Sequence, residues 1–175
     1  MTILSKNIFF SRLGSLAPIL LLLLTCILLR KKKIFLLVFL SGFVINNLLN
    51  IILKLTIKEP RPQDETRLFH LEVNNDKLIL FDKFGMPSSH AQNCFFCLSF
   101  TFCVLNTTLS NWIILLYVII SFISVCQRYI YNKHTILQLI VGSLIGILVG
   151  YVTFFSGNKL IKGRMSLKED DYCLV

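Results

Sequence analysis

Residues 85–90 combine a helix start with groups that bind phosphate and move protons. Pro87 favours the first turn of a helix, where its missing N–H costs nothing. Ser88 and Ser89 then place hydroxyls and unpaired backbone N–H groups at the positive end of that helix, an arrangement that binds phosphate. His90 follows closely enough to exchange a proton with a bound group. The segment therefore predicts a phosphate site with a proton donor beside it.

A second cluster contains Arg128, His134 and Gln138. Arg128 supplies positive charge, and Gln138 lies one helical turn beyond His134, on the same face of an expected helix. A hydrogen bond from the ring of His134 to Gln138 fixes the tautomer of the ring and leaves its other nitrogen free to attack. We therefore expect His134 to act as a nucleophile that Gln138 orients.

The third cluster is Lys54 with Arg61, which two prolines flank. Arg suits phosphate because its planar fork donates two parallel hydrogen bonds, whereas Lys adds a point charge. Basic residues also flank membrane spans without forming a site, and that explanation fits Lys58 better than Arg61. We expect Lys54 and Arg61 to fold over the same pocket as the other two clusters.

The composition of the chain indicates which elements carry these clusters. Its 175 residues are 55% hydrophobic with a mean hydropathy of +0.73, which is too apolar for an ordinary soluble domain. The formal charge is +9, but the basic residues flank apolar runs instead of forming an exposed stripe. We therefore expect the membrane bilayer as a partner, and no nucleic acid.

Apolar runs long enough for transmembrane helices occur at 15–29, 34–53, 86–105, 112–126 and 135–155. We predict an all-α, polytopic membrane helix bundle with about five transmembrane helices. It should form a single domain over residues 1–175, with a catalytic core at about 46–150. The polar loop that follows the second run is expected to be solvated, and its His70 is not expected to be a ligand.

Spacing inside these runs predicts two packing faces. Asn46, Asn47 and Asn50 share one face with Lys54, and we expect the three amides to form interhelical hydrogen bonds. Lys54 is an ionisable residue at the end of a membrane span, which favours a function for it. Small residues recur every four positions in the last run and predict close helix packing; they are Gly142, Gly146 and Gly150.

Because the spans alternate in direction, the three clusters should emerge at one membrane face. The residues expected there are Lys54, Arg61, Ser88, Ser89, His90, Arg128 and His134. Cations, hydroxyls and two His together describe a phosphate pocket with an acid and a nucleophile. No carboxylate cluster is placed there to hold a metal, so we expect no metal or cofactor, and Arg and Lys alone should meet the phosphoryl charge.

The patterns Lys54-x6-Arg61-Pro62, Pro87-Ser88-Ser89-His90 and Arg128-x5-His134 resemble the three motifs of the type 2 phosphatidic acid phosphatase superfamily. Within it, the dolichyl diphosphatases look most similar, through Glu59-Pro60-Arg61-Pro62 and the His134-Thr135-x-x-Gln138 ending. Gln127 and Gln138 stand where the superfamily's third motif usually has Ser and Asp. In the dolichyl diphosphatase subgroup, Gln follows the nucleophile.

This resemblance implies a covalent mechanism. His134 would attack the terminal phosphorus of a lipid diphosphate, and His90 would protonate the departing lipid phosphate and then activate water. Lys54, Arg61, Arg128 and the two Ser would hold the phosphoryl oxygens. The implied substrate is dolichyl or polyprenyl diphosphate, the glycan carrier of N-glycosylation in the endoplasmic reticulum. A broader lipid phosphatase for phosphatidate-like monoesters, and an inactive lipid-binding membrane protein, remain as alternatives.

Charge also predicts the orientation in the membrane. The basic residues at 30–33 and in the tail lie on the side opposite the pocket, and short basic clusters beside spans stay in the cytosol. The pocket should therefore face the lumen. Asn106, in the only acceptor triplet for N-glycosylation, lies opposite the pocket and should stay unmodified.

Overall fold

The computed structural model describes residues 8–62, 84–105 and 108–164. These residues form five helices, and their only β-type pairing is an isolated bridge between Pro60 and Phe84. The helices are α1 (Ile8–Leu28), α2 (Lys33–Ile57), α3 (Ser89–Val104), α4 (Thr108–Ile130) and α5 (Ile136–Arg164). The prediction of an all-α bundle is confirmed. His70, Asn106 and the end of the tail lie outside the described residues.

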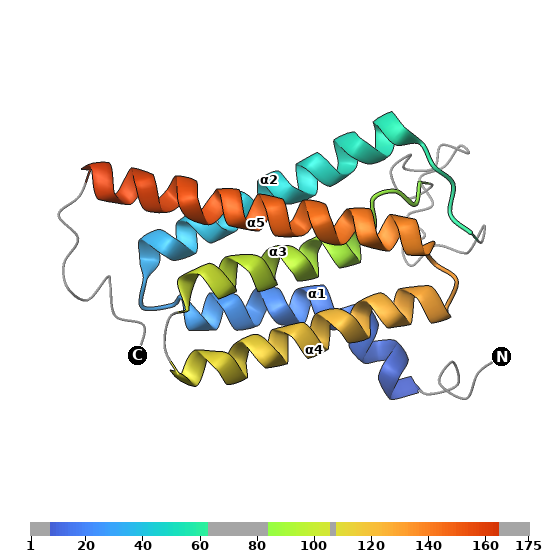
Figure 1. The fold of residues 1–175 in the computed structure, drawn as a ribbon, viewed down its shortest axis with the longest axis horizontal. Helices are drawn as coiled ribbons and strands as arrows, with labels where there is room; N and C mark the ends of the chain where they lie inside the picture. The colour runs from blue at the N-terminus through green and yellow to red at the C-terminus, as the bar shows by residue number, and fades with distance from the viewer. Residues whose placement is uncertain (1–7, 63–83, 106–107, 165–175) are drawn as a thin grey trace, which may run out of the picture.

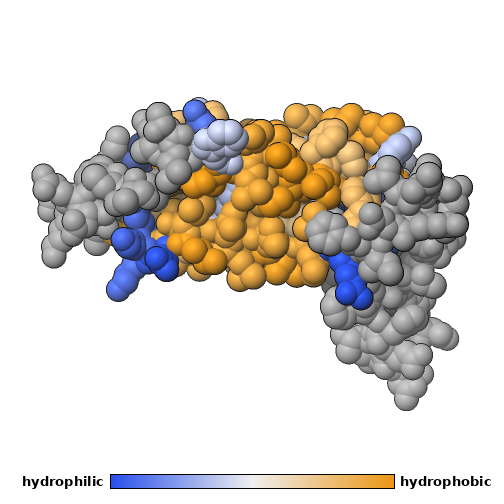
Figure 2. Space-filling view, turned by 90° about the horizontal axis from the view of Figure 1, so that it is seen from below, coloured by the Kyte–Doolittle hydropathy of each residue, from blue (hydrophilic) through white to orange (hydrophobic). Residues whose placement is uncertain are grey.

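Four of these helices, α1, α2, α4 and α5, are long and apolar enough to cross a membrane. Figure 2 shows the result as an apolar band between polar groups at the two ends of the bundle. α3 has 16 residues, which extend for about 24 Å, less than the roughly 30 Å of a bilayer core. The chain is thus an integral membrane protein whose shortest helix lies among longer ones.

The shortest helix is also the central one, because α3 packs against each of the other four helices. α1 pairs with α4, and α2 pairs with α5. Successive helices run in alternating directions, so α2 and α4 end where α3 and α5 begin (Figure 1). We call this end of the bundle the site end, and it is where the sequence places the three clusters.

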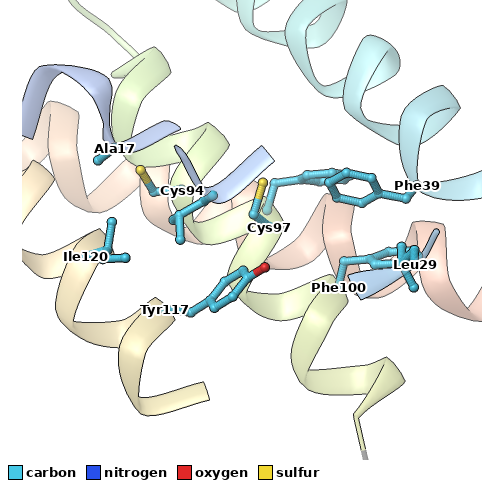
Figure 3. Packing of buried hydrophobic residues seen from close by; sticks show 10 residues of the cluster. Ala17, Leu29, Phe39, Cys94, Cys97, Phe100, Tyr117 and Ile120 are labelled. Carbon is cyan, nitrogen blue, oxygen red and sulfur yellow. The ribbon is translucent and has the colours of Figure 1, made fainter. Parts of the chain in front are cut away.

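Aromatic and small side chains fill the core between the helices. The ring of Phe39 in α2 packs against the rings of Phe96 and Phe100 in α3, with centroid distances of 5.6 and 5.2 Å. Cys94 and Cys97 are buried among these apolar side chains (Figure 3). The core therefore holds α2, α3 and α4 together below the site end.

The glycines of α5 allow its backbone to approach that of α3. A Cβ on Gly142 would lie 2.7 Å from the carbonyl oxygen of Ser88, and one on Gly146 would lie 3.0 Å from the backbone nitrogen of Phe96. Gly150 has a similar contact with the Phe96 carbonyl. The predicted packing face is confirmed, and it places the start of α3 against the start of α5.

The prediction that Pro87 lies in the first turn of a helix is wrong. α3 begins at Ser89, Ser88 is its N-cap, and Pro87 precedes the cap. The Ser88 N–H, expected to be unpaired, donates to the backbone oxygen of Gln138 at 3.2 Å. This hydrogen bond holds the backbone before α3 against the start of α5, so the helix begins only at Ser89.

The other four helices are all longer than the apolar runs that predict them, with the largest differences in α4 and α5. α4 runs from Thr108 to Ile130 and so includes Gln127 and Arg128, which we placed at or beyond the end of a span. α5 continues past residue 155 to Arg164, because Gly157 lies against the side chain of Val38 in α2 and extends the helix contact. The hydropathy of the chain therefore predicts the membrane-embedded part of each helix. Tertiary contacts extend the helices beyond that part.

Candidate active site

All the residues chosen from the sequence lie at the site end. Lys54 is in the last turn of α2, Arg61 follows that helix, Arg128 is in the last turn of α4, and His134 lies between α4 and α5. Ser88, Ser89 and His90 begin α3, and Gln138 is in the first turn of α5. Lys54, Ser88, Arg128, His134 and Gln138 are all buried.

A tight turn carries the chain from α4 to His134. Asn132 has a φ of 52°, in the left-handed region that Asn tolerates better than most residues. The N–H of the next residue, Lys133, donates to the carbonyl of Arg128 at 3.0 Å and closes the end of α4. The turn thereby brings His134 back toward Arg128.

Thr135 and Gln138 form a capping box at the start of α5. The Gln138 N–H donates to the Thr135 hydroxyl at 3.2 Å, and the Thr135 N–H donates to the Gln138 side-chain oxygen at 3.3 Å. His134 therefore precedes the helix. The prediction that His134 and Gln138 share a helical face is wrong. The two side chains still meet, with His134 Nδ1 3.0 Å from Gln138 Oε1.

The neighbours of Gln138 fix which way its amide points. Its Nε2 lies 2.8 Å from a carboxylate oxygen of Glu59 and 3.0 Å from the carbonyl oxygen of Pro60, both of which can only accept. Its oxygen therefore faces the Thr135 N–H and the ring of His134. Because that oxygen can only accept, the proton of His134 is on Nδ1, and Nε2 carries the lone pair.

The charges around His134 keep its ring neutral. The pKa of His134 is lowered to about 3, mainly by burial and further by the charges of Arg61, Lys54 and Arg128, against the opposing effect of the Gln138 hydrogen bond. A neutral ring with its lone pair on Nε2 is the form of histidine that attacks phosphorus. The site thus holds a neutral imidazole with an unprotonated Nε2 near cations of the kind that bind phosphoryl groups.

The second histidine, His90, meets both a donor and an acceptor at one ring nitrogen. Its Nε2 contacts the guanidinium of Arg128, and the backbone oxygen of Ser15 in α1 lies 3.3 Å away. A guanidinium only donates and a carbonyl only accepts. Neutral His90 can therefore pair with Arg128 and protonated His90 with Ser15, so the ring has a partner in both states of a proton-transfer cycle.

The two serines at the start of α3 differ in what their hydroxyls can do. Ser88 is fully buried, its hydroxyl does not cap the helix, and its Oγ has no hydrogen-bond partner among the described residues. The Ser89 hydroxyl lies 2.9 Å from Asn50 Oδ1, which can only accept, so the hydroxyl donates its hydrogen bond to Asn50. Ser88 is thus the hydroxyl available to donate to a phosphate at this helix start.

Asn50 belongs to a chain of side-chain amides that joins α2 to α3. Asn50 Nδ2 donates to Gln92 at 2.6 Å and to the Pro87 carbonyl at 3.3 Å, and Gln92 donates to Asn46 at 2.9 Å. Asn46 and Asn47 both hydrogen-bond to Asn93. The expectation of interhelical hydrogen bonds by the three Asn is confirmed, and the network fixes the helix of Lys54 against the start of α3.

The described side chains of the site suit an anion. No group of three His, Cys, Asp or Glu side chains that could hold a metal occurs in the described ranges. The groups that converge are guanidinium, ammonium, hydroxyl and imidazole, which bind phosphate oxygens.

Sequence reasoning missed some of the residues that build the site. Thr135 was not chosen, although Thr135-x-x-Gln138 is a readable capping-box pattern. Glu59 was noted only as part of a resemblance, and its contact with Gln138 depends on how the chain turns after α2. The backbone carbonyl of Ser15 carries no sequence signal, because any residue there would supply it.

Comparison with known proteins identifies the family of the chain. A model of the PAP2 superfamily matches residues 34–162, and the chain therefore belongs to the PAP2 superfamily. It is similar to the dolichyldiphosphatase of Saccharomyces cerevisiae (strain ATCC 204508 / S288c), with 31% identity over 121 residues, which cover 65% of this chain and 48% of that protein. The chain spans about half the length of this curated relative. No solved structure matches the chain.

Proposed function

We propose that this protein hydrolyses dolichyl or a related polyprenyl diphosphate to the lipid monophosphate and inorganic phosphate. The observation that carries the proposal is the state of His134: burial and the nearby cations keep its ring neutral, and the fixed Gln138 amide holds its proton on Nδ1 and leaves the Nε2 lone pair free. The substrate class is taken from the name of the yeast relative. The resemblance to the dolichyl diphosphatases supports a location in the endoplasmic reticulum, where the enzyme would recycle the carrier lipid of N-glycosylation.

The first half of the reaction forms a phosphohistidine. His134 Nε2 attacks the terminal phosphorus, and the bond from phosphorus to the bridging oxygen breaks. Burial and the charge of Arg128 lower the pKa of His90 to about 3, so His90 takes up a proton when the anionic diphosphate binds. It then gives this proton to the bridging oxygen as the lipid monophosphate leaves. The phosphoryl oxygens gain negative charge during this step, and they are held by Arg61, Arg128, Lys54 and the Ser88 hydroxyl.

The second half releases phosphate. His90, now neutral, takes a proton from water as the water oxygen attacks phosphorus, and the bond to His134 Nε2 breaks. Inorganic phosphate leaves, and both rings return to their starting states. The reaction consumes one water for each diphosphate and needs no metal ion, because the cations and the helix start meet the charge.

The direct test measures phosphate release by the purified full chain in detergent, with polyprenyl diphosphate and EDTA. We expect turnover in EDTA, loss of turnover and of acid-labile phosphoenzyme in His134→Ala, and a slower enzyme in His90→Ala. Full activity of His134→Ala would exclude the covalent mechanism.

The same assay with monoester competitors separates the alternatives. Equal turnover of phosphatidate would favour a broader lipid phosphatase. No turnover of either lipid would favour a lipid-binding protein, an alternative that Gln127 in place of the usual Ser keeps open. Gln127 is buried against Gly14 of α1, and its Oε1 has no hydrogen-bond partner within the described part of the chain.

A further inference from the structure

Glu59 is held in place on the Nδ1 side of His134, away from the Nε2 atom that would attack phosphorus. Its carboxylate accepts from Gln138 Nε2 at 2.8 Å, and its backbone oxygen accepts from the Gly85 N–H at 2.8 Å. Gly85 itself lies directly against the Gln138 amide, which leaves no room for a side chain at that position. Glu59, Gln138 and His134 therefore form a continuous hydrogen-bonded series from carboxylate to amide to imidazole.

Glu59 is the only acidic residue in the ranges that the structure describes. The charged groups that lower the pKa of His134 are Arg61, Lys54 and Arg128, and all three are cations. When Nε2 bonds to phosphorus, the imidazole ring becomes positively charged, and these cations oppose that change. A negative charge on the Nδ1 side of the ring would offset the repulsion between these cations and the positively charged imidazole.

We propose that Glu59 is a positioning residue for His134, acting through the amide of Gln138. The proposal rests on the proposed function and adds a residue to it. Glu59 holds the amide in the orientation that keeps the proton on Nδ1, and its charge, passed through the polarised amide, stabilises the positive ring that forms during attack. Glu59 touches neither the substrate nor the reacting atoms.

This arrangement also gives a physical reason for an amide at position 138. A carboxylate at 138 would face the carboxylate of Glu59 and the carbonyl of Pro60, and three acceptors with no proton between them repel one another. A Gln can donate to Glu59 and accept from His134 at the same time. Residues 59 and 138 should therefore be coupled in their effects on catalysis.

The first test compares two charge-changing variants of neighbouring residues. Glu59→Gln keeps the shape and an acceptor but removes the charge, and we expect kcat to fall about tenfold with little change in KM. Affinity for vanadate, which mimics the transferring phosphoryl group, should fall in parallel. Lys58→Gln, at an exposed position outside the site, should match the parent. Equal kcat and vanadate affinity in Glu59→Gln and the parent would overturn the proposal.

The second test is a double-mutant cycle. Gln138→Asp alone should be much slower than the parent, because it opposes two carboxylates. Adding Glu59→Gln should make the Asp variant at least about tenfold faster, although the same change slows the parent. Effects that simply add would mean that the two residues act independently, which contradicts the proposal.

The third test does not depend on turnover. In full chains labelled with ¹⁵N-histidine, NMR should report His134 as the Nδ1-protonated tautomer, assigned by loss of its signals in His134→Gln. Its Nδ1 signals should shift in Glu59→Gln and not in Lys58→Gln. Unshifted signals would overturn the role of Glu59 whatever the substrate is. Shifted signals in a chain that does not hydrolyse polyprenyl diphosphate would overturn the proposed function alone.

Discussion

The two serines that begin α3 are adjacent in sequence but different in chemistry. The Ser89 hydroxyl donates to Asn50 and completes an amide network, whereas Ser88 buries a hydroxyl without a partner among the described residues. An unsatisfied buried hydroxyl costs about 1–3 kcal/mol of stability. Ser88 thus lowers the stability of the ligand-free protein, and binding a phosphoryl oxygen would recover that energy.

Ser88→Ala should therefore change activity and stability in opposite directions. We expect kcat/KM for the lipid diphosphate to fall about a hundredfold, since one donor to the phosphoryl oxygens is lost. The apparent Tm in detergent should stay the same or rise, because an unpaired buried group is removed. Phosphate release and thermal unfolding of the purified variant measure both quantities.

Ser89→Ala is the matched control for this prediction. Its main cost should be stability, about 1 kcal/mol for a lost buried hydrogen bond, with a smaller effect on kcat/KM. If Ser89→Ala proves the slower enzyme and Ser88→Ala the less stable protein, the assignment of the two hydroxyls is wrong.

At the scale of the helices, the site depends on how closely α5 approaches α3. α3 carries Ser88 and His90, and α5 carries Gln138. The glycines between the two helices let the Ser88 N–H reach the Gln138 carbonyl. Close packing of the two helix backbones is thus part of the geometry of the proposed phosphate site.

Gly146→Ala should separate the two helices. Its methyl group would press on the backbone of Gln92 and Phe96, which cannot rotate away, and such overpacking costs about 1–3 kcal/mol. We expect a lower apparent Tm and slower phosphate release. Gly157→Ala is the control, because the methyl there meets only the side chain of Val38, which can adjust. Equal losses in both variants would contradict this explanation.

The sequence predicts the convergence of the three clusters because each lies next to the end of an apolar run, and alternating runs bring those ends together. It does not predict the helix bounds as well, since Gln127 and Arg128 are polar residues that continue α4. The meeting of His134 with Gln138 is predicted correctly, but from a helical face instead of a capping box. Glu59 could not be assigned, because a chain turn and not a sequence spacing places it.

At the scale of the whole molecule, the bundle has two chemically different ends. The turn from α1 to α2, with the basic residues 30–33, lies at the end opposite the site, and so does the C-terminal end of α5 (Figure 1). Basic segments beside membrane spans favour the cytosol. This arrangement supports our proposal that the site end faces the lumen.

Glycosylation of an introduced acceptor site measures the orientation. Asp76→Thr makes Asn74 an acceptor in the loop on the site side, and we expect it to be glycosylated in a eukaryotic cell. The same triplet added after Val175 should stay unmodified, as should Asn106. A glycan on Asn106 or on the added C-terminal triplet would reverse the proposed orientation.

The placement of the site within a few residues of several helix ends has a kinetic consequence. Under the proposed function, a lipid whose headgroup reaches this site keeps its hydrocarbon tail in the bilayer, so that enzyme and substrate would meet by lateral diffusion in two dimensions. The relevant concentration is then the mole fraction of the lipid in the surface and not its amount per litre. Added inert detergent dilutes that surface and lowers the rate at constant bulk substrate, whereas the phosphate product escapes into the aqueous phase.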